Sequence, residues 1–284
     1  MIDDGASPLR GRTIALTRPR SRVEELSLAF AEAGAAVRHF PVFSLRLVAG
    51  EARALARDRL RESVGAGEVW WAITSASVVS PLAAILAELP GSPDSWAGRV
   101  RWAVVGEATG RALHGSGLLP PEAPAPLVGT GAGAASLVGE IVRRVPGGVE
   151  RSGLPGPSSS SGPRVVHITS DRGRPELAEG IQAAGGVAQT VVVVRHHPEP
   201  DLRPEELLAE TVDALHFASP SAAEGLLAAC PAERRGALVA IPAVAIGPTT
   251  GEALRRLGFR RIVEAEAPGA REQVAAAVAL LPGP

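Results

Sequence analysis

Apolar runs alternate along the chain with segments whose apolar side chains follow helical spacing, and this order repeats in the two halves. Residues 11–18 form an apolar run, and a segment of helical spacing follows it up to Gly34. Residues 163–171 and the segment up to Gly185 repeat the same order. Each helical segment then leads into another extended run. Each half therefore opens with a βαβ unit, whose strands run parallel.

Two further strand-and-helix pairs recur in the same order. Residues 69–77 match residues 212–221, since both form a strand that ends in small hydroxyl residues and leads into an apolar helix. Residues 101–109 match residues 242–250, where each strand is followed by Gly, Thr and a helix. Strands that alternate with helices predict an α/β protein with two doubly wound, flavodoxin-like lobes, each with a parallel sheet.

The region between the repeated halves is rich in Gly, Pro and Ser, from residue 119 to residue 163. Its run 152–163 cannot form a packed element, and we expect a mobile loop there. A length of 284 residues also exceeds what one hydrophobic core usually fills, which favours two domains.

The predicted strand ends share a feature that suits a ligand. Ser, Thr, Gly or Pro follows each of six strands, and a helix starts directly afterwards, so backbone amides, hydroxyls and the positive end of the helix dipole favour anions there. For any single turn helix capping is the simpler explanation, because Ser221 with Glu224 and Thr249 with Glu252 have capping-box spacing. Six turns on two matched edges indicate a ligand with several anionic groups. The candidate binding residues are Thr17, Arg18, Ser75, Ala76, Ser77, Gly106, Thr109, Ser170, Arg172, Ser219, Ser221, Gly247, Thr249 and Thr250.

Composition and charge remove several classes of function. The formal net charge is −1 and there is no basic block, which disfavours a nucleic-acid partner. The chain has no lysine, which excludes a Schiff base, covalent pyridoxal phosphate and a complete P-loop. No stretch is long enough to span a bilayer, residues 1–8 have no apolar run, and the single cysteine, Cys230, excludes an internal disulfide. We expect a cytoplasmic protein.

The histidines form no recognisable metal motif, and residues 106–110 lack the third glycine of a dinucleotide-binding fingerprint. We therefore expect no metal and no nucleotide cofactor. His167 and His216 lie inside apolar strand runs, where packing is their expected role. No Ser-His-Asp set and no pair of acids stands out by spacing alone.

At these turns the chain resembles the uroporphyrinogen-III synthase family along nearly its whole length. The resemblance implies two lobes, one formed by residues 1–40 with 199–284 and the other by 46–190, joined by extended linkers at 41–45 and 191–198. The motifs that carry the resemblance are, in order, Thr17-Arg18-Pro19, Thr74-Ser75-Ala76, Val105-Gly106 with Thr109, Phe217 to Ser221, and Ile246 to Thr250 followed by Ala253-Leu254.

The resemblance also implies an activity, that of a cofactor-independent lyase of tetrapyrrole (heme) biosynthesis. Such enzymes close the linear tetrapyrrole hydroxymethylbilane into a macrocycle, with loss of water and inversion of the terminal pyrrole ring through a spiro intermediate. The substrate carries eight carboxylates, which suits many dispersed donors, and catalysis would rest mainly on positioning. The resemblance also implies a monomer whose partner is this one small molecule. By motif match, the substrate-lining positions are Ser75, Thr109, Ser219, Thr249 and Thr250.

Two positions depart from the family pattern. Ser77 stands where some members have a basic residue, and Val194 where members commonly have a tyrosine proposed as a proton donor. His196 and His197 are the titratable residues nearest to Val194 along the strand and are the candidates for a substitute donor, with water or a substrate carboxylate as the alternative. The missing tyrosine leaves open an inactive two-lobed binding or sensor protein. A sugar- or phosphate-binding enzyme is a third interpretation, because doubly wound lobes host many functions.

Overall fold

The computed structural model describes residues 7–19, 23–65, 67–89, 98–119, 123–129, 133–144 and 162–281. The chain divides into two compact units, Met1–Ser44 with His197–Pro284, and Leu45–His196. Most of the run expected to be a mobile loop, residues 152–161, lies outside the described residues.

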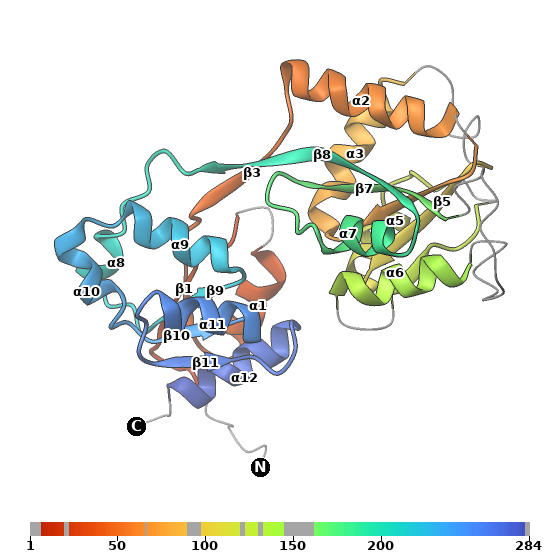
Figure 1. Ribbon diagram of the computed structural model, residues 1–284. Coiled ribbons are helices and arrows are strands. Elements are labelled where there is room, and N and C mark those ends of the chain that lie inside the picture. Colours follow the sequence, from red (N-terminus) through yellow and green to blue (C-terminus); the bar gives the residue numbers. More distant parts are fainter. Residues whose placement is uncertain are drawn as a thin grey trace, which may run out of the picture. The chain divides into compact units, whose positions relative to one another are not determined.

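The first unit contains a five-stranded parallel sheet in the order β11-β10-β9-β1-β2 (Figure 1). Its first strand is central because it pairs on both sides, with Ile14 opposite Val37 of one neighbour and Ala214 of the other. The strands are β1 (Thr13–Leu16), β2 (Ala36–His39), β9 (Ala214–Phe217), β10 (Ala243–Ala245) and β11 (Ile262–Glu264).

Helices cover both faces of this sheet. Ile14 and Leu16 pack in one core with Leu26 and Phe30 of α1 (Glu24–Glu32), and this core includes Ala277 of α12 (Ala270–Leu280). Helices α9 (Pro220–Ala229) and α11 (Pro248–Arg256) pack against each other and against β9 and β10. The other short helices in the described part of the unit are α8 (Glu206–Ala209), η3 (Ala232–Arg234) and α10 (Arg235–Leu238).

The second unit contains a six-stranded sheet in the order β3-β8-β7-β4-β5-β6 (Figure 1). The pairings of β4 with β5 and β7, of β5 with β6, and of β7 with β8 are parallel. The strands are β3 (Phe43–Leu47), β4 (Val69–Ile73), β5 (Val100–Val105), β6 (Leu127–Gly129), β7 (Arg164–Ser170) and β8 (Val187–Pro198).

Alternation along β4 directs side chains into two cores, one on each face of the second sheet. Trp71 and Ile73 pack in the core that includes residues of α2 (Gly50–Gly65), α3 (Val79–Leu86) and α5 (Glu107–His114). Trp70 and Ala72 pack in the core that includes residues of α6 (Gly133–Arg143) and α7 (Glu176–Ala183). The doubly wound parallel sheets that the sequence predicts are confirmed.

Strands β3 and β8 are the two segments along which the chain passes from one unit to the other. The two units divide after Ser44 and after His196, within the segments 41–45 and 191–198 where the resemblance implies linkers. Val193 and Val194 of β8 are fully buried in the core of the second unit.

Candidate functional site

The structure brings the candidate turns together at one edge of each sheet. In the first unit they follow β1, β9 and β10, which are neighbouring parallel strands, and in the second they follow β7, β4 and β5, which are also neighbours. The carboxyl ends of parallel strands meet at the same edge, where doubly wound sheets bind their ligands. The first edge thus carries Thr17, Arg18, Ser219, Ser221, Gly247, Thr249 and Thr250, and the second carries Ser75, Ala76, Ser77, Gly106, Thr109, Ser170 and Arg172.

Each edge contains a pair of serine hydroxyls at the start of a helix. The hydroxyl oxygens of Ser75 and Ser77 are 2.7 Å apart, and those of Ser219 and Ser221 are 3.0 Å apart. Ser75 accepts a hydrogen bond from the backbone N–H of Ser77 at the start of η2 (Ala76–Val78), and Ser219 accepts one from Ala222 at the start of α9. The repeat of the sequence is therefore also a repeat of local geometry.

The capping boxes suggested by the sequence are not formed. Helix α9 begins at Pro220, so its N-cap is Ser219 and not Ser221. Helix α11 begins at Pro248, so its N-cap is Gly247, and Thr249 lies exposed in the first turn. A proline fixes the backbone at the first helical position, which sets both starts earlier than the hydroxyl spacing suggests for a capping residue.

Two of the helix starts at these edges have glycine as the N-cap. The N-caps of α5 and α11 are Gly106 and Gly247, neither of which has a side chain that could accept a hydrogen bond. In α11 the first residue is Pro248, which has no N–H, and the N–H of Thr250 donates to the carbonyl of Gly247, so Thr249 carries the remaining N–H of this turn. Gly106 has a φ of 75°, a left-handed conformation that favours glycine. The positive end of each helix dipole then faces the edge, which favours anions such as carboxylates.

Three of the candidate threonines are buried. Thr17, Thr109 and Thr250 are between 0% and 4% exposed, so their hydroxyls are not presented at the surface in this structure. The hydroxyl of Thr17 donates to the backbone carbonyl of His216 at 2.8 Å, which ties the end of β1 to β9. Ser75, Ser77, Ser170 and Ser219 are half-buried, whereas Arg172 and Thr249 are exposed.

A buried hydrogen-bonded network positions Arg18 at the first edge. The Arg18 Nη2 donates to Oε1 of Gln273 at 3.4 Å, and Nε2 of His216 lies 2.6 Å from the same oxygen. The Gln273 amide nitrogen donates to the carbonyls of Pro268 and Gly269, so its oxygen must be the acceptor toward His216. It follows that His216 carries its proton on Nε2.

Both strand histidines are buried, as the sequence predicts, and burial keeps them neutral. Burial, together with the nearby Arg18 charge, lowers the pKa of His216 to about 3, against a smaller opposing effect of Gln273. Burial lowers the pKa of His167 to about 4, although Glu176 opposes it. Nε2 of His167 lies 3.2 Å from the hydroxyl of Thr74, at the start of the turn after β4. Each unit thus has a buried, neutral imidazole on a strand that ends at the candidate turns.

Sequence reasoning missed Gln273, although a signal was present. Gln273 is 1% exposed and lies on the same buried side of α12 as Ala276, Ala277 and Leu280. A glutamine in an otherwise apolar buried stripe indicates a buried polar network, because a lone buried amide is strongly destabilising.

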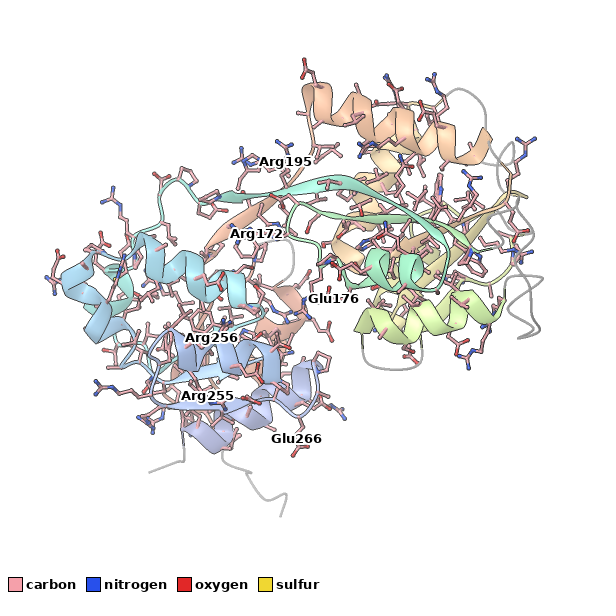
Figure 2. The ribbon with its side chains drawn as sticks, in the orientation of Figure 1. Arg172, Glu176, Arg195, Arg255, Arg256 and Glu266 are labelled. Atoms are coloured by element: carbon pink, nitrogen blue, oxygen red, sulfur yellow. The ribbon has the colours of Figure 1, made fainter. Side chains whose placement is uncertain are left out.

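The two candidate proton donors are placed differently. Nδ1 of His196 lies 2.7 Å from the Asp171 carboxylate on the turn after β7, whereas His197 is exposed. Arg172 follows on the same turn, and Arg195 precedes His196 on β8 (Figure 2). Asp171 was not singled out by sequence reasoning, because its partner is 25 residues away in the chain.

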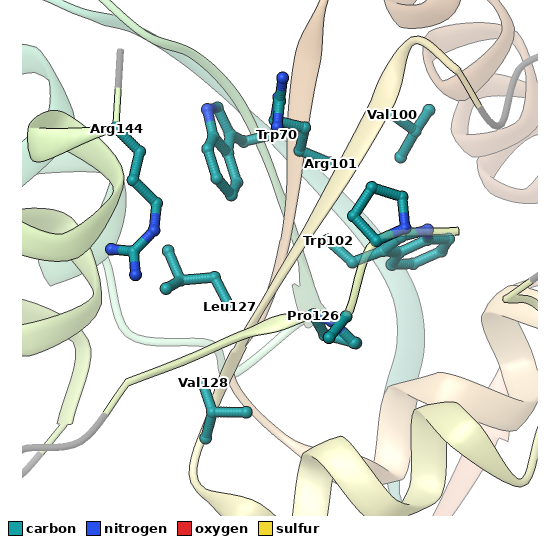
Figure 3. Close-up of a pocket in the computed structure, with 10 residues that line it drawn as sticks. Trp70, Val100, Arg101, Trp102, Pro126, Leu127, Val128 and Arg144 are labelled. Carbon is teal, nitrogen blue, oxygen red and sulfur yellow. The ribbon is translucent and has the colours of Figure 1, made fainter. Parts of the chain in front are cut away.

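A cavity of about 330 Å³ lies at the other end of the second sheet (Figure 3). It is lined by Trp70, Arg101, Trp102, Leu127 and others from the amino-terminal parts of β4, β5 and β6, away from the candidate turns. Its two arginines are already paired, Arg101 with Glu68 and Arg144 with Glu140. We do not assign the ligand to this cavity.

Over the described ranges, no group of three or more His, Cys, Asp or Glu side chains could hold a metal ion. In the same part of the chain, none of the helices has the length and apolar character needed to cross a membrane.

Comparison with known proteins was made for both sequence and structure. Residues 151–275, less than half of the chain, match a family model described as Uroporphyrinogen-III synthase HemD. Comparison with curated protein sequences finds no match. A mutant uroporphyrinogen III synthase from the extremely thermophilic bacterium Thermus thermophilus matches with a TM-score of 0.59 and 22% identity, over 95% of this chain and 98% of that one.

A uroporphyrinogen-III synthetase from Helicobacter pylori matches with a TM-score of 0.57 and 14% identity, over 95% of this chain and 100% of that one. At these identities the two structures show a shared fold. The resemblance to the uroporphyrinogen-III synthase family that the turn motifs predict is thus confirmed, by sequence over residues 151–275 and by fold over most of the chain.

Proposed function

We propose that the chain is a uroporphyrinogen-III synthase, a lyase of tetrapyrrole and heme biosynthesis. It closes hydroxymethylbilane into a macrocycle, with loss of water and inversion of the terminal pyrrole ring. The observation that carries this proposal is the repeated set of turns at the carboxyl ends of three neighbouring strands in each sheet, where serine hydroxyls, helix starts and arginines suit anions. A linear substrate with eight carboxylates needs many separate donors, and each edge carries several. We further propose that the enzyme acts as a cytoplasmic monomer without metal or nucleotide.

Three kinds of donor support this proposal. The start of α5 and the N–H of Thr249 in α11 offer backbone amides, the serine pairs offer hydroxyls, and Arg18 and Arg172 offer guanidinium groups. Most are neutral, which agrees with a chain whose formal net charge is −1. Dispersed donors of this kind hold a flexible substrate in one conformation. Such positioning favours ring closure with inversion of the terminal pyrrole ring over direct ring closure without inversion.

The burial of Val194 bears on the inactive alternative. Val194 is 0% exposed and belongs to the core of the second unit, so its side chain is part of the packing in this chain. A valine at this position is therefore accounted for by packing and is not by itself a sign of lost catalysis. No other described residue favours a sensor or a sugar-binding enzyme.

The proposal is tested by supplying freshly made hydroxymethylbilane to the purified chain and separating the isomers of the product. We expect predominantly the type III isomer. Type I alone would refute the proposal, because that isomer forms by ring closure without inversion.

A further inference from the structure

The turn after β7 and the end of β8 are joined by three hydrogen bonds around one carboxylate. The backbone N–H of Asp171 donates to the carbonyl of Val194 at 2.9 Å. In return, the Asp171 Oδ1 accepts from the backbone N–H of His196 at 3.0 Å and lies 2.7 Å from its Nδ1. The imidazole is therefore held in one orientation by the carboxylate and by its own backbone.

An irregularity in the strand register directs His196 to this place. Thr169 of β7 lies opposite Val192 of β8, but Ser170 lies opposite Val194, so Val193 is an extra residue of β8. Both Val193 and Val194 are consequently buried, instead of alternating. An extra residue of this kind re-aims the side chains that follow it, and such irregularities are frequent beside active sites.

The hydrogen bonds define which nitrogen of His196 can exchange a proton with a ligand. An ionised carboxylate only accepts hydrogen bonds, so Nδ1 of His196 carries its proton toward Asp171 and exchange takes place at Nε2. Burial raises the pKa of Asp171, but hydrogen bonds from the side chain and backbone of His196, with the nearby Arg172 charge, outweigh this and lower it. Asp171 is therefore ionised at neutral pH and acts as the acceptor that orients the imidazole.

The pair is partly accessible from outside. The side chain of His196 is 13% exposed and that of Asp171 is 31% exposed, so a ligand bound at the turn can reach them. They lie beside Ser170 and Arg172, at the edge where we propose that the substrate binds. The charged residues on the segments around them are Arg172, Arg174, Glu176, Arg195 and, on the neighbouring strand β3, Arg46.

We infer that His196, oriented by Asp171, is the general acid of the reaction; this inference rests on the proposed function. The imidazolium Nε2–H protonates the hydroxyl oxygen of the substrate, the C–O bond breaks, and water leaves. The electron pair of the adjacent pyrrole nitrogen stabilises the resulting cation. Closure of the macrocycle later releases one proton from a ring carbon, which returns to the neutral imidazole, so that no net proton is consumed. His196 is the catalytic residue, and Asp171 is a positioning residue.

Substitution by asparagine separates catalysis from a structural role. In His196→Asn the side-chain amide takes the place of Nδ1, so a donor to Asp171 is kept while the titratable Nε2 is removed. His196→Gln places its amide near Nε2 instead. We expect both variants to remain folded and to lose kcat for type III formation by about 100-fold or more.

Asp171→Asn and His197→Gln complete the experiment. Asp171→Asn should lower kcat with little change in KM, since the imidazole loses the carboxylate that orients it. His197→Gln, at the exposed neighbour, should match the parent. If the parent forms type III product and His196→Asn keeps the parent kcat, the inference is overturned while the proposed function stands. If the parent forms only type I, the proposed function itself fails.

Discussion

His167 and His216 link the stability of the two units to pH. Burial lowers their pKa values from 6.5 to about 4 and about 3. Between these values and 6.5 the unfolded chain binds a proton that the folded chain does not. Stability therefore rises with pH across this window and is lost as the pH falls below about 6.5.

Substituting one of these histidines should make the unfolding free energy depend less on pH. For His216→Gln we expect the loss of unfolding free energy between pH 7 and pH 5 to be smaller than in the parent by about 2 kcal/mol. Urea unfolding at a series of pH values measures this. His197→Gln, at an exposed position, should leave the parent slope unchanged. Equal slopes for His216→Gln and the parent would contradict the assignment of His216 as neutral and buried.

Individual residues show which features the sequence could predict and which it could not. The apolar runs around His167 and His216 predicted their burial correctly, because a strand pattern reports the environment of each position. The pattern could not show that Gln273 joins His216, since the two are 57 residues apart and only the fold brings them together. The same holds for Asp171 and His196.

At the scale of elements, the repeat of strand, turn and helix was sufficient to predict the parallel sheets and the edge where the turns meet. It was insufficient to predict the start of each helix. The true N-caps Ser219 and Gly247 depend on the prolines that follow them, not on the spacing of hydroxyl and acidic residues. Buried hydroxyls, as in Thr109, also required the packed structure.

The two glycine N-caps form a matched pair for testing turn geometry. A Cβ atom on Gly106 or on Gly247 would meet no other atom within 4 Å, so space does not distinguish them. Gly106 has a φ of 75° and Gly247 an extended φ of 171°. We expect Gly106→Ala to lower the unfolding free energy by about 1 to 2 kcal/mol, and Gly247→Ala by less than about 0.5 kcal/mol. Equal effects in urea unfolding would argue against the left-handed turn at Gly106.

If many separate donors share the binding of the substrate (dispersed recognition), removing one turn hydroxyl should lower kcat/KM only modestly. Thr249 is exposed in the first turn of α11, and Ser75 is half-buried at the start of η2. Each neutral hydrogen bond contributes about 1 kcal/mol, so Thr249→Ala and Ser75→Ala should each lower kcat/KM about fivefold. The double variant should lose about the product of the two factors. Complete loss of activity in either folded single variant would contradict dispersed recognition.

At the scale of the whole molecule, the sequence predicted two domains from length and repeat, and the structure divides the chain into two units. The linker implied at residues 191–198 stays a prediction. Its valines also pair with β7, and Val193 and Val194 are buried in the core of the second unit. Periodicity cannot distinguish an extended linker from a buried strand when the run consists of consecutive valines.

The central claim is that this chain directs ring closure toward inversion. The most direct test is the fraction of type III isomer formed from hydroxymethylbilane as the concentration of chain is raised, with chelator present and heat-denatured chain as the control. Spontaneous closure gives type I at a rate that does not depend on the chain. We expect the type III fraction to rise with chain concentration until it predominates, while the control gives type I throughout. A product that stays type I at every concentration of folded chain would contradict the account.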